Sequence, residues 1–128
     1  MIHFDMVTRV FTANEWKVIE SGVKQRTKAL NLFLHDIYNG ANIIKEKIIP
    51  AELVYKSRAF ESSMVGFSPP RKIFSHISGI DIVRTSLNKF VVLEDNCRTP
   101  SGVSYMMQNR EIMTVSYTHL RAHETSTY

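Results

Sequence analysis

The pattern of apolar and polar residues predicts two neighbouring strands in the last third of the chain. Residues 91–98 begin with an apolar run and end in acid, amide and arginine, and a proline and glycine break follows. Residues 77–84 also have the composition of a strand, and the polar segment 85–89 between the two suits a turn. We therefore expect an antiparallel hairpin that carries polar groups to an exposed loop.

The register of this hairpin determines which side chains meet. Side chains two residues apart share a face of a strand, so Glu94 and Asn96 lie on the same face, together with Phe90 and Val92. The other face is expected to carry Val91, Leu93 and Asp95. If the turn is centred between Leu87 and Asn88, Asp81 lies directly opposite Glu94, and opposed residues project from one face.

A long helix is predicted before the hairpin. Thr12 and Glu15 have the spacing of a capping box, so the helix begins at Ala13, and Gly40 supplies its stop. Arg26 falls on the apolar stripe of this helix, where a charged side chain needs a partner or a ligand. A solvated head above an aliphatic stem is an equally good interpretation of Arg26.

The remaining segments complete an α+β fold, with N-terminal helices followed by a small antiparallel sheet and a C-terminal helix. Short helices are expected at residues 41–47 and 50–56, the second with Pro50 at its first position. Strands are expected at 64–67 and 72–78, and a helix at 102–113.

Composition places the chain among ordinary soluble proteins of one domain. It has 128 residues, 44% of them hydrophobic and 22% charged, with a net charge of +4 that is scattered rather than clustered. Nucleic-acid binding is therefore not favoured. No apolar run reaches the length of a membrane span and no signal sequence begins the chain, so we expect no membrane association and a cytoplasmic location.

The predicted hairpin edge has the chemistry of a magnesium site. Asp81, Glu94 and Asn96 offer a few hard oxygen ligands, which suits Mg²⁺ shared with nucleotide phosphates. Arg98 follows as a fork-shaped cation for phosphate. The start of the 102–113 helix favours anions, and the candidate contacts there are Thr99, Ser101, Gly102 and Ser104.

Two further residues near this edge have competing interpretations. His76 lies close to Asp81 in the sequence, although a lone histidine is more often structural than a ligand. Cys97 is the single cysteine, so no intrachain disulfide can form, and without a motif-bound histidine we expect a small packed side chain rather than a nucleophile.

These residues carry a specific family resemblance. Asp81, the run from Glu94 through Asn96 to Arg98, and Pro100 with Gly102 resemble the metal-binding edge of ATP-grasp ligases. More widely, the amino-acid sequence of residues 3–114 resembles that of the circularly permuted type 2 members. The resemblance includes Trp16 and positions within residues 25–38, 49–53, 76–81 and 93–106. Gly79 departs from the general pattern, because many members carry arginine two residues before the aspartate.

The resemblance implies a function for these residues. It implies an enzyme that binds ATP and Mg²⁺ and joins a small carboxylate or peptide substrate to an amine through an acyl phosphate. Asp81, Glu94 and Asn96 would hold the metal, and Arg98 would act in catalysis. The phosphate-side contacts would be Arg98, Thr99, Ser101, Gly102, Ser104, Arg26 and His76.

The C-terminal residues resemble a different kind of sequence. Residues 115–128 are similar to a translated sequencing adapter, so we expect an artefactual, disordered tail that takes no part in the fold. Residues 1–114 would then be a partial ATP-grasp domain with the metal-binding edge and without the nucleotide lid. Such a fragment is expected to be inactive alone.

Two other classes of function remain open at this stage. A basic RNA-binding module would need an arginine-rich or aromatic surface that the sequence does not offer. A non-catalytic scaffold or partner-binding fragment is compatible with the first 70 residues, which carry little chemistry.

Overall fold

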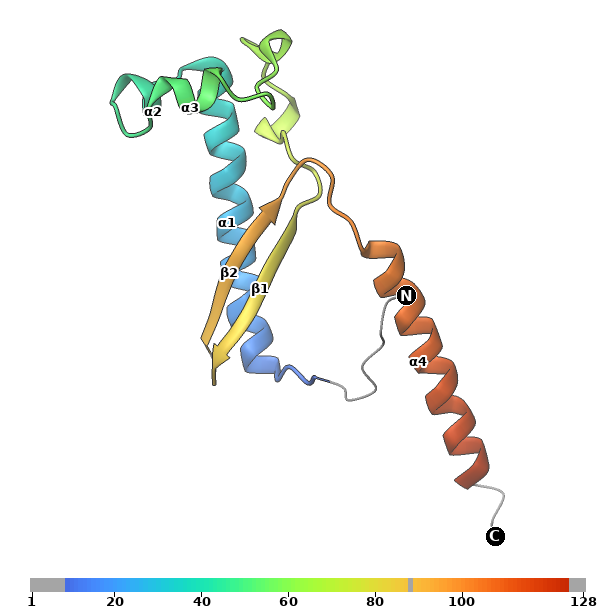
Figure 1. The fold of residues 1–128 in the computed structure, drawn as a ribbon. Coiled ribbons are helices and arrows are strands. Elements are labelled where there is room, and N and C mark those ends of the chain that lie inside the picture. Colours follow the sequence, from blue (N-terminus) through green and yellow to red (C-terminus); the bar gives the residue numbers. More distant parts are fainter. Residues whose placement is uncertain (1–8, 88, 125–128) are drawn as a thin grey trace.

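The computed structural model describes residues 9–87 and 89–124, with side chains through residue 115. Its longest element near the N-terminus is helix α1 (Ala13–Asn39), along which the other parts are arranged (Figure 1). The predicted capping box is confirmed: Glu15 N donates to Thr12 Oγ1 at 3.2 Å, and Thr12 N donates to Glu15 Oε2 at 2.9 Å. This reciprocal pair satisfies backbone donors that a helix start leaves free, so α1 begins at the predicted residue.

Helix α1 ends where it was predicted to end, but by a different turn. Gly40 follows the last helical residue with φ −97°, and the left-handed residue is Ala41, with φ 51°. A Cβ at position 40 would lie 2.7 Å from Asn42 Nδ2, so a larger residue there would displace the Asn42 side chain. That amide donates to Asp36 Oδ1 at 2.8 Å, so the close approach is part of the turn itself.

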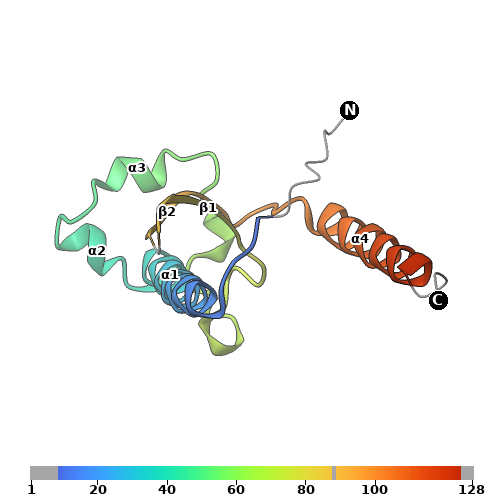
Figure 2. The same cartoon turned by 90° about the horizontal axis from the view of Figure 1, so that it is seen from below.

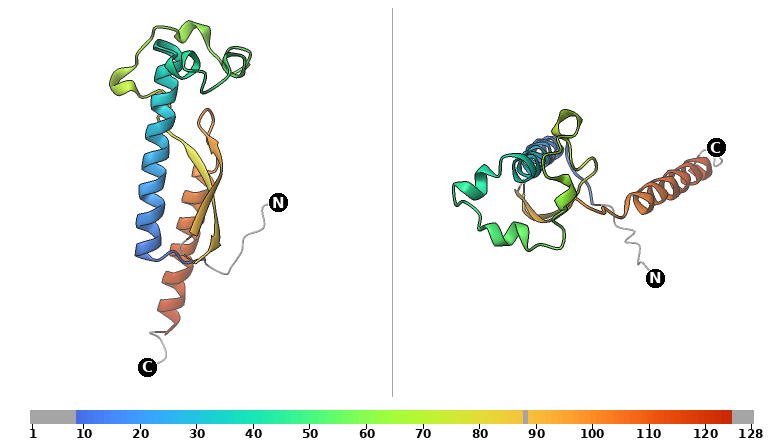
Figure 3. Two further views of the ribbon diagram at one scale, coloured as in Figure 1. Left: turned by 90° about the vertical axis from the view of Figure 1, so that its left-hand side faces the viewer. Right: turned by 90° about the horizontal axis from the view of Figure 1, so that it is seen from above.

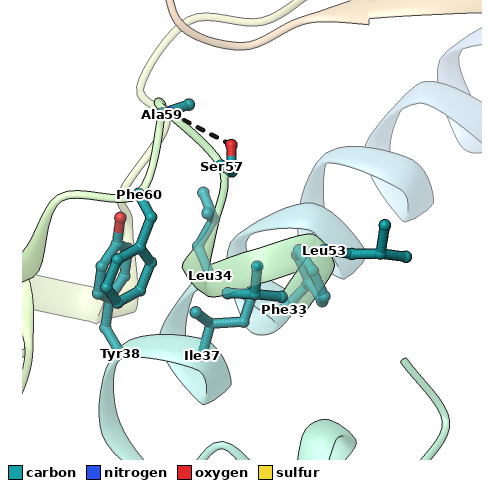
Figure 4. A pocket seen from close by; sticks show the side chains of 9 residues that line it. Phe33, Leu34, Ile37, Tyr38, Leu53, Ser57, Ala59 and Phe60 are labelled. Carbon is teal, nitrogen blue, oxygen red and sulfur yellow. Dashed lines mark hydrogen bonds between the residues drawn. The ribbon is translucent and has the colours of Figure 1, made fainter. Parts of the chain in front are cut away.

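Two short helices follow and pack near the end of α1. They are α2 (Asn42–Lys45) and α3 (Ala51–Tyr55), both shorter than the sequence predicts, and Pro50 is the N-cap of α3 rather than its first helical residue. Tyr38 stacks on Phe60 with ring centroids 5.3 Å apart. Figure 4 shows these two rings beside an apolar cleft that side chains of α1, α3 and residues 57–60 line.

The strands expected at residues 64–67 and 72–78 are not formed. The structure has single 3-10 turns instead, η1 (Ser62–Met64) and η2 (Pro70–Lys72), and an irregular link to residue 78. The amide groups of Phe74 and Ser75 donate to Asn31 Oδ1 at 2.8 and 2.9 Å. Because a side chain on α1 takes these donors, no neighbouring strand is needed to satisfy them.

The predicted hairpin is present. Strands β1 (Gly79–Ser86) and β2 (Lys89–Asn96) pair antiparallel, and they form the two-stranded sheet of the described residues. Leu87 lies in the turn between them, and Asn88 is outside the described residues. The hairpin runs alongside α1 (Figure 3), so one of its faces is directed to the helix and the other away from it.

The last element is α4 (Val103–Glu124), which stands apart from α1 and the hairpin (Figure 2). The helix was expected to end at Met113, so its boundary is corrected by eleven residues and includes positions 115–124, which were expected to be disordered. The side chains of residues 116–128 lie outside the described part, and an adapter origin of residues 115–128 stays a prediction. The mixed α+β class is confirmed.

Candidate functional site

The hairpin brings together the three side chains that were expected to meet. Asp81 is the register partner of Glu94, as the turn length predicted, and directly opposed residues share a face. Asn96 Nδ2 donates to Glu94 Oε1 at 3.0 Å. All three side chains are exposed, so an ion or a ligand can reach their oxygens from solvent. We call Asp81, Glu94 and Asn96 the oxygen edge.

A β-bulge decides what lies behind this edge. The register shifts between Asp81 and Ile82, which leaves Leu93 as an extra residue on β2. The prediction that Phe90 and Val92 share a face with Glu94 is therefore wrong. Phe90, Val92 and Asp95 are the half-buried residues of β2, as expected for a bulged strand that directs them toward α1. Asp95 lies on the face opposite Glu94 and Asn96, as strand alternation predicts, and the bulge brings Phe90 and Val92 to the same helix side.

Asp95 binds the helix through Arg26. The guanidinium donates from Nε to both carboxylate oxygens, at 2.6 and 2.9 Å, and from Nη2 to Oδ2 at 2.6 Å. These bonds hold the pKa of Asp95 below its usual value, and the same bonds raise the pKa of Arg26. Arg26 thus has the partner that its place on the apolar stripe required. Its contact with a nucleotide stays a prediction.

A second ion pair joins the other end of the hairpin to α1. Arg84 Nη2 donates to Glu15 Oε2 at 3.2 Å, and the Arg84 guanidinium lies 4.6 Å from the ring centroid of Phe11. Glu15 is buried, and the backbone hydrogen bond from Thr12 is the main reason that its pKa is lowered. The hairpin is therefore attached to the helix at both ends, which limits its movement relative to α1.

A hydrogen-bond network that the sequence analysis missed supports the loop after β2. Ser75 is buried, and its Oγ contacts the carbonyl oxygen of Cys97 at 3.2 Å and Ser78 Oγ at 3.0 Å. Asn31 holds Ser75 in turn, through its backbone. The sequence feature that could have indicated this network is Asn31, a polar residue in the middle of a long helix with no capping role.

The loop itself folds close to the start of β1. A Cβ at Gly79 would lie 3.3 Å from Pro100 Cβ and 3.4 Å from Asn96 Cβ. The missing side chain at this position therefore gives Pro100 and Asn96 the space in which they lie. Gly79, noted as a departure from the family pattern, is the residue that permits this approach.

The predicted phosphate contacts extend from this loop into α4. Arg98 is exposed and makes no hydrogen bond or ion pair within the described part of the chain. The other residues expected there are also exposed; they are Thr99, Ser101, Gly102 and Ser104. Gly102 has φ 91° directly before the first turn of α4, a backbone conformation that glycine adopts without strain. The loop is thus open beside the oxygen edge.

His76 and Cys97, the other two residues considered near the edge, lie in different surroundings from the oxygen edge. His76 is exposed and lines a groove between α1 and η2, together with lysines and an arginine. Cys97 is half-buried and free, and its backbone carbonyl rather than its thiol is what Ser75 binds.

The oxygen edge differs from the usual composition of a metal centre. Within residues 9–87 and 89–124, no group of three His, Cys, Asp or Glu side chains could hold a metal ion. The edge has two carboxylates and an amide, and the hydrogen bond through Asn96 Nδ2 leaves its Oδ1 as the atom to offer a cation. Such a set suits an ion that keeps waters and shares phosphate oxygens, as Mg²⁺ does.

None of the helices in the described part is both long and apolar enough to cross a bilayer. The described chain therefore offers no helical membrane span.

Comparison with known proteins identifies relatives across most of the chain. Residues 8–127 match a family model described as a circularly permuted ATP-grasp, a match that continues past residue 114, where the sequence resemblance was expected to end. A Synechocystis protein is 43% identical over 113 residues, covering 88% of this chain and 24% of its own. A Mycobacterium tuberculosis protein is 44% identical over 118 residues, covering 92% of this chain and 21% of its own. Both are named as uncharacterized proteins.

A third relative has a name that describes an activity. The Frankia casuarinae protein named "Putative glutamate--cysteine ligase 2-2" is 37% identical over 109 residues, covering 85% of this chain and 12% of its own. The chain thus spans about a quarter or less of the length of these curated relatives.

Proposed function

The chain belongs to the circularly permuted ATP-grasp family, and we propose that its oxygen edge holds the Mg²⁺ of an ATP-dependent carboxylate–amine ligase. The observation that carries the proposal is the register pair Asp81 and Glu94, with Asn96 hydrogen-bonded beside it. Three oxygen donors on one open face of a rigidly attached hairpin are what a phosphate-bound magnesium ion requires from a protein.

The donor set supports magnesium more than zinc or a purely structural ion. The described edge offers carboxylate and amide oxygens, and softer or closed metal sites use cysteine or histidine ligands. Bound there, the ion would neutralise charge on the transferred phosphoryl oxygens. The residues of this chain would fix its position through the hairpin and leave its other coordination sites to water and ATP.

Arg98 has a separate role in this proposal. It begins the loop one residue after Cys97, is exposed, and has no partner among the described residues. A guanidinium in this state can donate two parallel hydrogen bonds to a phosphate or carboxylate. We assign to it the stabilisation of the transferred phosphoryl group, with Thr99, Ser101, Gly102 and Ser104 as polar contacts around that group.

The reaction has two steps. A carboxylate oxygen of the acid substrate attacks the γ-phosphorus of ATP, the bond to the bridging oxygen breaks, and ADP leaves with the electron pair. The amine nitrogen then attacks the acyl carbon of the acyl phosphate, inorganic phosphate leaves, and the nitrogen loses a proton to give an amide. Neither step needs a thiol, which agrees with a structural role for Cys97. Because ATP is the substrate, we place the reaction in the cytoplasm.

The name of the Frankia relative gives a candidate pair of substrates. Glutamate and cysteine are a carboxylate and an amine, the two classes that the proposed reaction joins. We propose this chemical class for the full-length relatives, with the present chain supplying the metal-binding part of their site.

Binding of Mn²⁺ tests the metal assignment on this chain directly. A paramagnetic ion broadens the NMR signals of nearby amides, so titration should broaden residues 81, 94 and 96 first. Glu94→Gln should weaken the effect by about tenfold, because a neutral amide replaces one of two carboxylates. Glu46→Gln, an equal change on the exposed residue directly after α2, serves as the matched control.

The pattern of broadening decides between outcomes. Broadening that spares the hairpin, or that is the same in wild type and Glu94→Gln, would overturn the metal assignment. Broadening confined to the hairpin and lost in Glu94→Gln but not in Glu46→Gln would support it.

A further inference from the structure

A groove lies between α1 and η2, away from the residues assigned above. Its volume is about 530 Å³, within the range of small-molecule sites. Side chains from α1 form one wall and residues 71–76 form the other. The lining residues on which the following argument depends are Lys24, Lys28, Arg71, Lys72 and His76.

The charge of this lining has a single sign. Four of the lining side chains are permanently cationic, His76 adds an imidazole, and no carboxylate is among the lining residues. Lys24 pairs with Glu20 at 2.6 Å, outside the groove lining. The side chains of Lys28, Arg71 and Lys72 form no hydrogen bond or ion pair with any residue that the structure describes. A concave surface with one sign of charge concentrates ions of the opposite sign.

The backbone at one wall is strained. Arg71 and Lys72 are consecutive residues with φ 58° and 59°, in the left-handed region that residues other than glycine seldom occupy. Strain of this kind is found where a surface must present particular side chains, and here both residues line the groove. The strained turn therefore brings two cations opposite the lysines of α1.

The lining also has an apolar part, beside the polar residues Thr27, Asn31 and Ser75. Val23, Leu32 and Ile73 contribute aliphatic side chains, and the methylene stems of the lysines add to the same surface. A bare inorganic ion would leave these groups without a partner. We propose that the groove binds a small organic anion with two or more negative charges and an apolar portion, either a phosphate ester or a polycarboxylate.

This site is independent of the oxygen edge. It needs no metal ion, because the protein supplies the positive charge itself. His76, which was also considered for the nucleotide site, lines this groove. Its ring can stack on or donate to an anion held by the surrounding cations.

Calorimetry on the full 128-residue chain tests the proposal without magnesium and at constant ionic strength. The probes are phenyl phosphate and phthalate, which represent the two sources of negative charge and both carry an apolar ring. We expect saturable binding of at least one probe. Lys28→Glu combined with Lys72→Glu should weaken it by about tenfold or more, because both walls then repel the ligand. The matched control is Lys17→Glu with Lys45→Glu, an equal charge change outside the groove.

The comparison of the two probes identifies the ligand class. Binding of phenyl phosphate alone indicates a phosphate ester, and binding of phthalate alone indicates a polycarboxylate. The absence of saturable binding for both would overturn the proposal. So would equal weakening in the groove and control variants, which would mean that only net charge matters. Loss of binding in Arg98→Glu, with the groove variant unchanged, would assign the anion to the loop after β2 and also overturn it.

Discussion

Arg26 on α1 holds both carboxylate oxygens of Asp95 on β2, across 69 residues of sequence, with its three hydrogen bonds between 2.6 and 2.9 Å long. Asp95 lies between Glu94 and Asn96 in the chain, and strand alternation directs its side chain to the opposite face of β2. The ion pair on the helix side of β2 therefore holds in place the strand segment that carries Glu94 and Asn96 on its open face. Arg26 and Asp95 are positioning residues for the oxygen edge.

Breaking this pair should weaken metal binding although neither residue contacts the metal. We expect Asp95→Asn to lower Mn²⁺ affinity by on the order of tenfold, as loss of an outer support does in known metal sites. Arg26→Lys should have a similar effect, because an ammonium group cannot donate to both oxygens in the same fork geometry. NMR titration measures the affinity, and the double variant separates a shared cause from two independent ones.

The result of the double variant is decisive. If the two changes act through one ion pair, the double variant should be no worse than either single variant. Additive losses, or wild-type affinity in Asp95→Asn, would contradict the positioning role.

Acidification should destabilise the folded chain over a narrow range of pH. Bonds from Arg26 lower the pKa of Asp95, backbone bonds from Ile43 lower that of Asp36, and a backbone bond from Thr12 lowers that of Glu15. A carboxyl group with a depressed folded-state pKa contributes stability above its unfolded value, here 3.8 for aspartate and 4.5 for glutamate. That contribution is lost as the pH falls through the lower folded values.

Urea unfolding followed by circular dichroism at a series of pH values measures this effect. The free energy of unfolding should fall from about pH 4.5 downward, and the fall should be smaller in Asp36→Asn. Glu46→Gln is the control, and it should leave the slope unchanged. A slope that is the same in wild type and Asp36→Asn would show that this carboxylate does not contribute.

Gly79→Ala should disturb the oxygen edge without unfolding the chain. The new Cβ would lie 3.3 Å from Pro100 Cβ and 3.4 Å from Asn96 Cβ, so the loop must move by a few tenths of an ångström. We expect Mn²⁺ affinity to fall by about threefold to tenfold, because Asn96 is displaced relative to Glu94.

Two further variants make this test specific. Pro100→Gly removes the nearer obstacle, so it should partly restore affinity in Gly79→Ala. Gly22→Ala is the matched control: it lies within α1 with no atom within 4 Å of the new Cβ, and it should stabilise the chain by about 0.5–1 kcal/mol. Unchanged metal affinity in Gly79→Ala would mean that the loop yields at no cost to the edge.

Asn31→Ala should destabilise the chain, and more than Asn31→Asp does. It removes the acceptor for the amides of Phe74 and Ser75, and their bonds are 2.8 and 2.9 Å long. Leaving buried donors unsatisfied costs about 1–3 kcal/mol, measurable as a lower free energy of unfolding in urea. Asn31→Asp keeps an acceptor and should lose less. Equal losses in the two variants would assign the role of Asn31 to packing instead.

The proposed chemistry is tested in a full-length member of the family that carries the same motif. Glu94→Gln should lower turnover by about a hundredfold or more and change ATP affinity less, because the metal stabilises the transition state more than bound ATP. Cys97→Ser should be nearly silent, because the acyl-phosphate route uses no thiol. An inactive Cys97→Ser enzyme beside an active Glu94→Gln enzyme would indicate thiol chemistry instead.

The sequence alone predicted the start of α1 and the pairing of Asp81 with Glu94. Thr12 and Glu15 form their capping box within one turn. The two-residue turn pairs Ser86 with Lys89, and Asp81 still meets Glu94 because the two register shifts between them cancel. Both features depend on residues that are close in sequence, so local patterns contain the information. The family resemblance followed from the same short motif and was confirmed by the match over residues 8–127.

The surroundings of that edge were decided only in the tertiary structure. The bulge at Leu93 brings Phe90 and Val92 to the face of Asp95, toward α1, and strand alternation cannot reveal an extra residue. Residues 72–78 alternate like a strand, yet Asn31 takes the amide groups that a strand would pair. In each case the local structure depends on contacts with residues of α1, which are distant in sequence. Such contacts exist only when the elements are packed together.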